Sequence, residues 1–321
     1  MGNPPSAAPP PSPLKQVIAR LKPYLRWMIL GGAIFFLAKA IKDHWQEVAA
    51  IRIGAMGWAY LAIALGITLL AHVWSGVVWG WILRELGQPV RPFWSISVYL
   101  TTNIAKYLPG NVWHFYGRVV AAKDQGISTS LASLSVLLEP LLMAASALIV
   151  TLLAGEQENL IWRAIALLAV LIGVHPRILS PLLKIVKKLK QKGKESTPTE
   201  LPYQIPRYPL LSLAGEMGFL LLRGSGFLVI FWVLSSGNSF PVVQLLSAFS
   251  FAWLLGLVVP GAPGGIGVFE ASMLALLEQQ FPVGIVLGAV ALYRLISTLA
   301  EALGAGFAYL FTPKALKAVE E

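Results

Sequence analysis

Two proline-glycine breaks interrupt the hydrophobic sequence of this chain, and each is followed by a charged residue. The first is Lys106-Tyr107-Leu108-Pro109-Gly110-Asn111, which runs on to Gly117-Arg118; the second is Pro260-Gly261-Ala262-Pro263-Gly264-Gly265-Ile266-Gly267, which runs on to Glu270. A broken helix is tolerated in a membrane only where protein or a water-filled cavity satisfies the freed backbone groups. Two such breaks at corresponding positions in two halves of a chain indicate a transport site.

The composition indicates a polytopic membrane protein. Of the 321 residues, 56% are hydrophobic and only 12% are charged, and the mean hydropathy is +0.70. Soluble domains carry about 25% charged residues. The net charge of +10 resides in cations clustered in short loops, a pattern that sets membrane topology and attracts anionic lipids rather than nucleic acid. The chain has no cysteine, which excludes disulfides, thiolate metal sites and cysteine nucleophiles.

Six runs are long or apolar enough to cross a membrane, against the ~20 residues that a crossing needs: 25–41, 54–83, 128–153, 160–175, 209–236 and 283–311. The basic loop 177–207 should remain cytoplasmic. We expect a disordered cytoplasmic N-terminus over 1–19, a transmembrane domain over 20–312 and a cytoplasmic tail over 313–321. The predicted location is the plasma (inner) membrane, with both termini in the cytoplasm.

These assignments agree only if residues 93–122 and 243–280 each return to the side from which they start. Each such hairpin lies between two long helices, and the two hairpins enter from opposite faces, which is typical of an inverted-repeat transporter. The predicted fold is therefore all-α and polytopic, with about six spanning helices and two broken or re-entrant hairpins in an inverted repeat. Charge counting does not distinguish a re-entrant hairpin from two full crossings.

Ionisable residues inside a membrane are functional candidates, because a buried charge is costly unless it is paired. The candidates are Lys106, Arg118, Glu139, Glu216, Arg223, Glu270, Arg294 and Glu301. Glu139 and Arg294 occupy corresponding helices after the two breaks, so we predict an ion pair between them across the pseudo-twofold axis. The alternative is that each pairs locally in a structural role. Glu270 is expected to line a wet path or to meet a cation.

The helix that begins after Pro263 presents its N-terminus to the glycine-rich break, an arrangement suited to a phosphate or carboxylate. Tight helix packing through small residues is the alternative. A polar cluster between Asn103 and Arg118, predicted near the cytoplasmic face, would suit a lipid phosphate. The histidines have no metal-ligand spacing and no serine-histidine-acid set is visible. We therefore predict no catalytic residues, no metal and no cofactor.

Several of these segments together resemble one known family. They are Asn103, Leu108–Trp113, Gly117-Arg118, Glu139, Pro263–Glu270 and Tyr293-Arg294. The chain is similar in them to the flippase-like transmembrane domain of the lysylphosphatidylglycerol synthase family, over about residues 20–312. The chain ends soon after the last predicted helix, so we expect it to lack the aminoacyl-transfer domain of the full-length synthases. The resemblance implies lipid movement or lipid-linked glycan handling, and not lipid aminoacylation.

The predicted function is a transporter, a flippase of an anionic or glycosylated lipid, and not an enzyme. The predicted substrate-binding or translocation residues are Asn103, Lys106, Pro109, Asn111, Arg118, Glu139, Gly264, Gly265, Gly267, Glu270 and Arg294. The expected partners are membrane lipids, with anionic headgroups favoured, and no nucleic acid. Two other functions stay open: a partner subunit of an enzyme that handles lipid-linked glycans or modifies lipids, and a membrane scaffold that transports nothing. A homo-oligomer or an enzyme partner also stays open.

Overall fold

The computed structural model describes residues 35, 39, 42–107, 112–154, 160–173, 175–178, 208–235, 237–259 and 262–311, and within these residues all regular secondary structure is helical. The main elements are α2 (Trp45–Ala50), α3 (Ala55–Glu85), α4 (Pro92–Asn103), η1 (Ile104–Tyr107), α5 (Trp113–Asp124), α6 (Thr129–Ala154), α7 (Leu160–Gly173), α9 (Leu210–Leu234), α10 (Val242–Val258), η2 (Pro263–Gly265), α11 (Val268–Leu277) and α12 (Val283–Phe311). The predicted all-α fold is confirmed.

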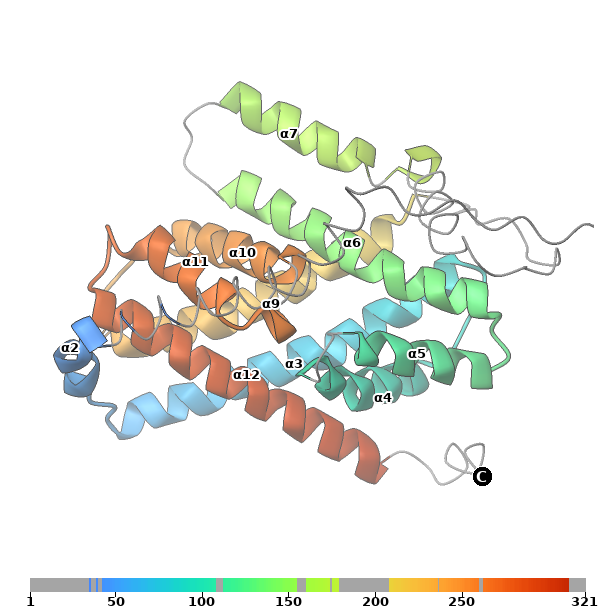
Figure 1. Cartoon of the computed structure of the whole chain (residues 1–321). Helices are drawn as coiled ribbons and strands as arrows, with labels where there is room; N and C mark the ends of the chain where they lie inside the picture. The colour runs from blue at the N-terminus through green and yellow to red at the C-terminus, as the bar shows by residue number, and fades with distance from the viewer. Residues whose placement is uncertain are drawn as a thin grey trace, which may run out of the picture.

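Four of the described helices, α3, α6, α9 and α12, are long and apolar enough to cross a membrane. They match the predicted crossings 54–83, 128–153, 209–236 and 283–311 closely. The predicted crossing 160–175 corresponds to α7, which has only 14 residues. The predicted crossing 25–41 and the basic loop 177–207 lie almost entirely outside the described residues. The long helices follow the long direction of the molecule (Figure 1).

Glycine and proline end one helix and begin the next. At the end of α3, Gly87 has a φ of 77°, and the amide of Gln88 donates to the carbonyl of Leu83 at 2.8 Å. This left-handed residue closes the helix at no steric cost, because glycine has no Cβ. Pro92 then occupies the first turn of α4, where its missing N–H leaves no hydrogen bond unmade. The chain therefore turns back sharply into the first hairpin.

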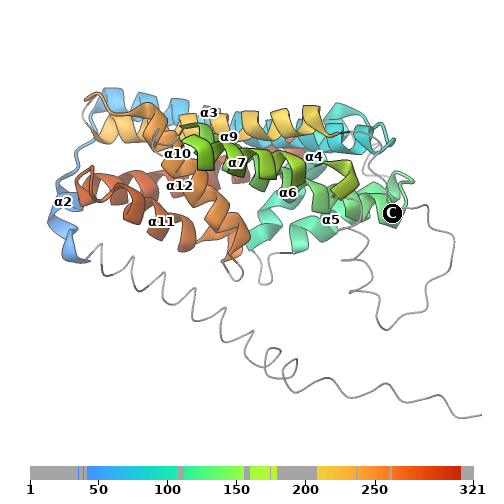
Figure 2. The same cartoon turned by 90° about the horizontal axis from the view of Figure 1, so that it is seen from above.

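Each hairpin returns to the end of the bundle from which it starts. The α4–α5 hairpin starts and finishes at the end of the bundle where α3 ends, and the α10–α11 hairpin starts and finishes at the opposite end, near α2 (Figures 1 and 2). At 1.5 Å per residue, the 10–12 residues of α4, α5 and α11 rise about 15–18 Å and the 17 residues of α10 about 26 Å, against the ~30 Å of a hydrocarbon core. The two breaks meet inside the bundle, where Gly264 of η2 lies against the Tyr107 ring of η1.

The inverted repeat consists of α3, the α4–α5 hairpin and α6 in the first half, and of α9, the α10–α11 hairpin and α12 in the second. The first helices of the halves, α3 and α9, pack along each other (Figure 2). Their contact is close where small residues meet large ones: the indole N–H of Trp74 donates to the Gly215 carbonyl at 2.7 Å. This arrangement places both hairpins, which enter from opposite ends, beside one shared interior.

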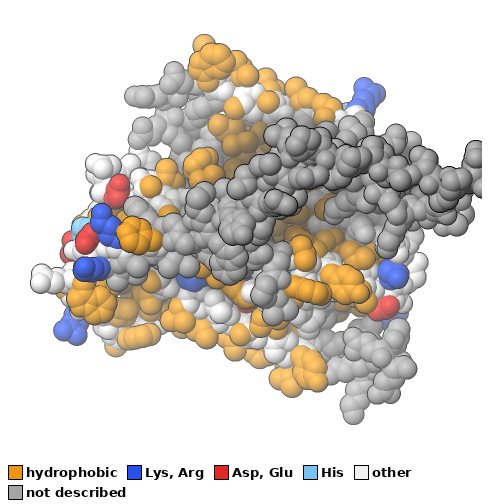
Figure 3. Space-filling model, in the orientation of Figure 1, with side chains coloured by type: hydrophobic (Ala, Val, Ile, Leu, Met, Phe, Trp, Pro, Cys, Tyr) orange, Lys and Arg blue, Asp and Glu red, His pale blue; other side chains and the backbone are white. Residues whose placement is uncertain are grey.

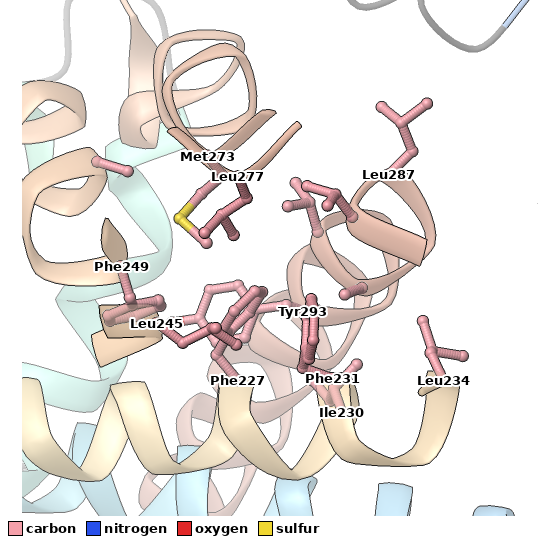
Figure 4. Packing of buried hydrophobic residues seen from close by; sticks show 14 of the residues in the cluster. Phe227, Ile230, Phe231, Leu234, Leu245, Phe249, Met273, Leu277, Leu287 and Tyr293 are labelled. Atoms are coloured by element: carbon pink, nitrogen blue, oxygen red, sulfur yellow. The ribbon is translucent and has the colours of Figure 1, made fainter. Parts of the chain in front are cut away.

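The largest hydrophobic cluster is in the second half, between α9, α10, α11 and α12 (Figure 4). Aromatic rings dominate it: Phe227, Phe249 and Tyr293 have centroids 5.4–5.7 Å apart, the separation that favours edge-to-face and offset contacts. On the molecular surface, hydrophobic side chains dominate the described face, and charged ones gather near its two ends (Figure 3). This distribution is that of a protein surrounded by lipid.

Outside the spanning helices, α2 is attached to the beginning of α12. The Glu47 carboxylate accepts a hydrogen bond from the Gly284 amide at 2.9 Å and contacts the His44 ring at 2.7 Å. The His44 hydrogen bond, with that of Gly284, holds the pKa of Glu47 below its usual value. An ionised carboxylate at a helix N-terminus is favourable, so Glu47 fixes the start of α12.

Candidate functional site

A cavity of about 510 Å³ lies between the two hairpins and the long helices. Among the described residues that line it, four are cations, Lys106, Arg118, Arg223 and Arg294, and only Glu139 is a carboxylate. Aromatic and aliphatic side chains complete the wall. Pockets that bind small ligands are mostly apolar, with a few polar groups placed to fix the ligand. The excess of cations makes this cavity suited to an anion.

The cavity reaches the lipid-facing surface. Leu137 and Leu141 of α6 and Val258 of α10 line it, and they are 40%, 44% and 60% exposed. Leu137 and Leu141 lie in the middle of α6, and Val258 lies at the tip of the second hairpin. The opening is therefore lateral, on the flank of the bundle formed by α6 and the second hairpin. A lipid headgroup inside the cavity would leave its acyl chains outside, in the bilayer.

The first buried ion pair belongs to the first half of the repeat. Arg118 of α5 donates through Nη1 to the Glu139 carboxylate of α6, and both residues are almost fully buried. Tyr99 of α4 contributes a hydrogen bond to Glu139 and a ring 4.6 Å from the Arg118 guanidinium. The pair therefore joins both arms of the first hairpin to the helix that follows it.

The second ion pair belongs to the second half. Arg294 of α12 contacts Glu270 of α11 through Nε at 2.6 Å and Nη2 at 2.5 Å, and its Nη1 donates to the Gly264 carbonyl at 3.0 Å. The other Glu270 oxygen accepts from the Gly267 amide at 2.6 Å, which caps α11. The anion at this helix N-terminus is therefore the chain's own carboxylate.

The predicted pair between Glu139 and Arg294 is wrong, because each binds a hairpin residue of its own half: Arg118 and Glu270, respectively. The two halves carry the same pair with the signs exchanged. In the first half the hairpin supplies the cation and the long helix the anion; in the second half the roles are reversed. The pairing energy is gained locally, because each hairpin packs on the helix that immediately follows it.

A third network joins the two halves. The Lys106 ammonium of η1 contacts Glu301 of α12 at 2.6 Å, and the His72 Nε2 atom of α3 lies 3.3 Å from the same carboxylate oxygen. Arg223 of α9 approaches His72 at 3.0 Å and donates to Ser297 of α12 at 2.8 Å. The tip of the first hairpin is thus held by a helix of the second half.

Arg223 is the cation with the least compensation in this wall. Its hydrogen-bond acceptors are an imidazole and a hydroxyl, and neither is a carboxylate. Its Nε has no hydrogen-bond partner among the described residues although the side chain is buried. The guanidinium lies 5.1 Å from the Tyr293 ring centroid, which compensates the charge only in part. Arg223 is therefore available to an anion in the cavity.

The cavity brings together most of the predicted site residues: Asn103, Lys106, Arg118, Glu139, Gly264, Gly265 and Arg294 line it. Gly267 and Glu270 lie behind its wall, as the cap of α11 and the partner of Arg294. Pro109 and Asn111 lie outside the described residues. Within the predicted polar cluster, the Arg118 side chain is buried inside the bundle and only 2% exposed.

Four residues of the site were absent from the predicted set: His72, Arg223, Ser297 and Glu301. Arg223 and Glu301 are intramembrane charges, and that signal was present in the sequence. His72 and Ser297 had no sequence signal, because their role comes from contacts between helices far apart in the chain. Within the described residues, no group of three or more His, Asp or Glu side chains is placed to hold a metal ion.

A comparison with curated proteins gives no match to this chain. The sequence model of the family described as Lysylphosphatidylglycerol synthase TM region matches residues 24–304. The match covers both hairpins, both ion pairs and the whole described cavity, and it agrees with the resemblance in the two break motifs. The chain is a multi-pass membrane protein that belongs to the lysylphosphatidylglycerol synthase TM region family.

Proposed function

We propose that this protein moves an anionic or glycosylated lipid between the leaflets of the membrane, and that it is a transporter rather than an enzyme. The observation that carries the proposal is the laterally open cavity whose wall holds Arg223, a buried cation that hydrogen-bonds to no carboxylate among the described residues. A charged headgroup in a bilayer core needs a polar path. The cavity supplies such a path at the depth where the two hairpin tips meet.

The hairpins provide a means of access from both sides. The two hairpins lie at opposite ends of the bundle, and an ion pair attaches each one to the long helix that follows it. Inverted repeats of this kind allow alternating access, in which one half moves against the other around a fixed site. In this mechanism Arg223, on long helix α9, holds the headgroup while the hairpins open in turn.

The proposal is tested by translocation of fluorescent lipids in proteoliposomes that contain the purified protein. Phosphatidylglycerol and a polyprenyl-phosphate-linked sugar are the anionic probes, and phosphatidylcholine is the zwitterionic reference. We expect anionic probes to cross faster than the reference and faster than in protein-free vesicles. Rates equal to those of protein-free vesicles for every probe would contradict transport and would favour the enzyme-partner or scaffold function.

Arg223→Gln is expected to slow translocation of the anionic probe about tenfold or more. A hydrogen bond to a charged group contributes about 1.5–3 kcal/mol, and each 1.4 kcal/mol corresponds to a factor of ten. The matched control is Arg91→Gln, because Arg91 is an exposed arginine just before α4. Equal rates for wild type and Arg223→Gln would exclude Arg223 as a headgroup ligand.

A further inference from the structure

Glu216 is a buried carboxylate that the cavity and the ion pairs do not use. It lies in the second turn of α9 and has no exposed surface. Neither of its carboxylate oxygens has a hydrogen-bond partner among the described residues. An isolated ionised carboxylate is so costly to bury that such a group is neutralised instead. Glu216 therefore needs a compensating positive charge, or a proton.

The local balance of charge supplies no free cation. Glu139 and Arg118 are the charged groups whose fields act on Glu216. Arg118 is already paired with Glu139, which also accepts a hydrogen bond from Tyr99. One guanidinium thus faces two carboxylates, and two carboxylates that share a site do not both stay ionised. Because Glu139 has the direct contacts, the uncompensated member is Glu216.

The other helices around α9 do not change this balance. Helix α10 carries no charged residue. The charged groups of the other packed elements do not face Glu216 as free cations: Arg84 of α3 is exposed, Glu85 accepts from Ser212, His72 contacts Arg223 and Glu301, Lys106 contacts Glu301, and Arg294 contacts Glu270. Helix α6, which carries Glu139, packs on α9, and the Ser146 hydroxyl of α6 donates to the Leu213 carbonyl at 3.1 Å.

We propose that Glu216 and Glu139 form a proton-binding site, in which Arg118 compensates one carboxylate and a proton held on Glu216 compensates the other. Glu139 and Arg118 also line the cavity, so the proton exchanges with water that enters the cavity. The site needs no ligand other than a proton. Its protonation follows from burial and from the two-to-one ratio of carboxylates to guanidinium.

The same geometry links the proton to an anion in the cavity; this link rests on the proposed function. Arg118 and Arg223 line the same cavity, so an anionic headgroup held by Arg223 that also contacts Arg118 competes with Glu139 for the Arg118 guanidinium. Glu139 then loses its counter-charge beside Glu216, and the pair takes up a second proton from the cavity. Linkage is reciprocal, so protonation of the pair favours anion binding by the same factor. The anion and the proton would therefore bind together and move with little net charge.

Infrared spectroscopy of the purified wild-type protein at neutral pH tests the proton site without any transport measurement. A protonated carboxylic acid has a carbonyl stretch distinct from those of a carboxylate, and it shifts in heavy water. We expect one such band in wild type that is lost in Glu216→Gln and retained in Glu278→Gln, an exposed control. A band unchanged by Glu216→Gln, or no band in wild type, would overturn the proposal.

A second variant, Glu216→Leu, covers the case in which glutamine prevents folding. Replacing an unpartnered neutral group by an apolar one of similar volume is close to neutral for stability. We therefore expect Glu216→Leu to fold and to lack the band. A folded Glu216→Leu protein that keeps the band would overturn the assignment to Glu216.

Proton uptake tests the link to the anion. On addition of short-chain phosphatidylglycerol to wild type in weak buffer, a pH indicator should report uptake of up to one proton per protein, and short-chain phosphatidylcholine should cause none. If the infrared band is present but the lipid causes no proton uptake, the proton site is supported and its coupling to anion binding is contradicted. If both the band and the proton uptake are present but the protein translocates no lipid, only the proposed transport function is contradicted.

Discussion

Replacing Arg118 with glutamine is expected to lower the free energy of unfolding by about 3–5 kcal/mol, the cost of leaving one partner of a buried ion pair uncompensated. Arg118 and Glu139 are 2% and 1% exposed, so water does not replace the lost guanidinium. The variant also loses the contact between the guanidinium and the Tyr99 ring. The measurement is equilibrium unfolding of the purified protein in mixed detergent micelles.

A double-mutant cycle separates this pair from the one predicted by the sequence. The variant Arg118→Gln/Glu139→Gln should be more stable than the sum of its single changes indicates, because neither buried charge is left alone. For Glu139→Gln and Arg294→Gln, the changes in the free energy of unfolding should add in the double variant to within about 0.5 kcal/mol, because these residues belong to different pairs. Coupling in the second cycle and none in the first would contradict pairing within each half.

Gly265→Ala is expected to lower the free energy of unfolding by about 2–5 kcal/mol, from left-handed backbone strain and overpacking together. Gly265 has a φ of 73°. An added Cβ would lie 3.2 Å from the Cα and carbonyl oxygen of Gly256 in α10. These are backbone atoms, so no side chain can rotate away to make room. The same unfolding assay measures the effect, and Gly265→Leu should prevent folding altogether.

Gly66→Ala is the matched control, because a Cβ at this position in α3 has no heavy atom within 4 Å. Its helical conformation suits alanine, so we expect no loss of stability. If both variants were as stable as wild type, the close approach of η2 to α10 would not contribute to folding. A flexible break would then be the better description of residues 263–267.

The break motifs themselves carried much of the information on the fold. Proline and glycine inside apolar sequence fix where helices cannot continue, and loop charges fix the side to which each hairpin returns. These local rules were enough to place α3, α6, α9 and α12 and to predict two hairpins that enter from opposite ends. They did not show whether the hairpins crossed the membrane, because a re-entrant hairpin and two crossings preserve the same parity.

The sequence predicted which charged residues belong to the candidate site, but not which of them form ion pairs. Arg118, Glu139, Glu270 and Arg294 were all recognised as intramembrane charges, because an ionisable residue in an apolar run has few structural explanations. The sequence could not determine which charge meets which. Corresponding positions in the two halves suggested a pair across the axis, whereas each hairpin packs on its own following helix.

The sequence by itself determined the class of protein, the positions of the spanning helices, the two breaks and the family, because hydropathy, helix-breaking residues and motif spacing are local properties of the chain. Only the tertiary structure decided that the two breaks meet inside the bundle, that the ion pairs form within each half, and that His72, Arg223 and Ser297 join residues from distant helices. Packing decides these features, because the partner of a buried charge is whichever side chain the helix crossings bring within hydrogen-bond distance.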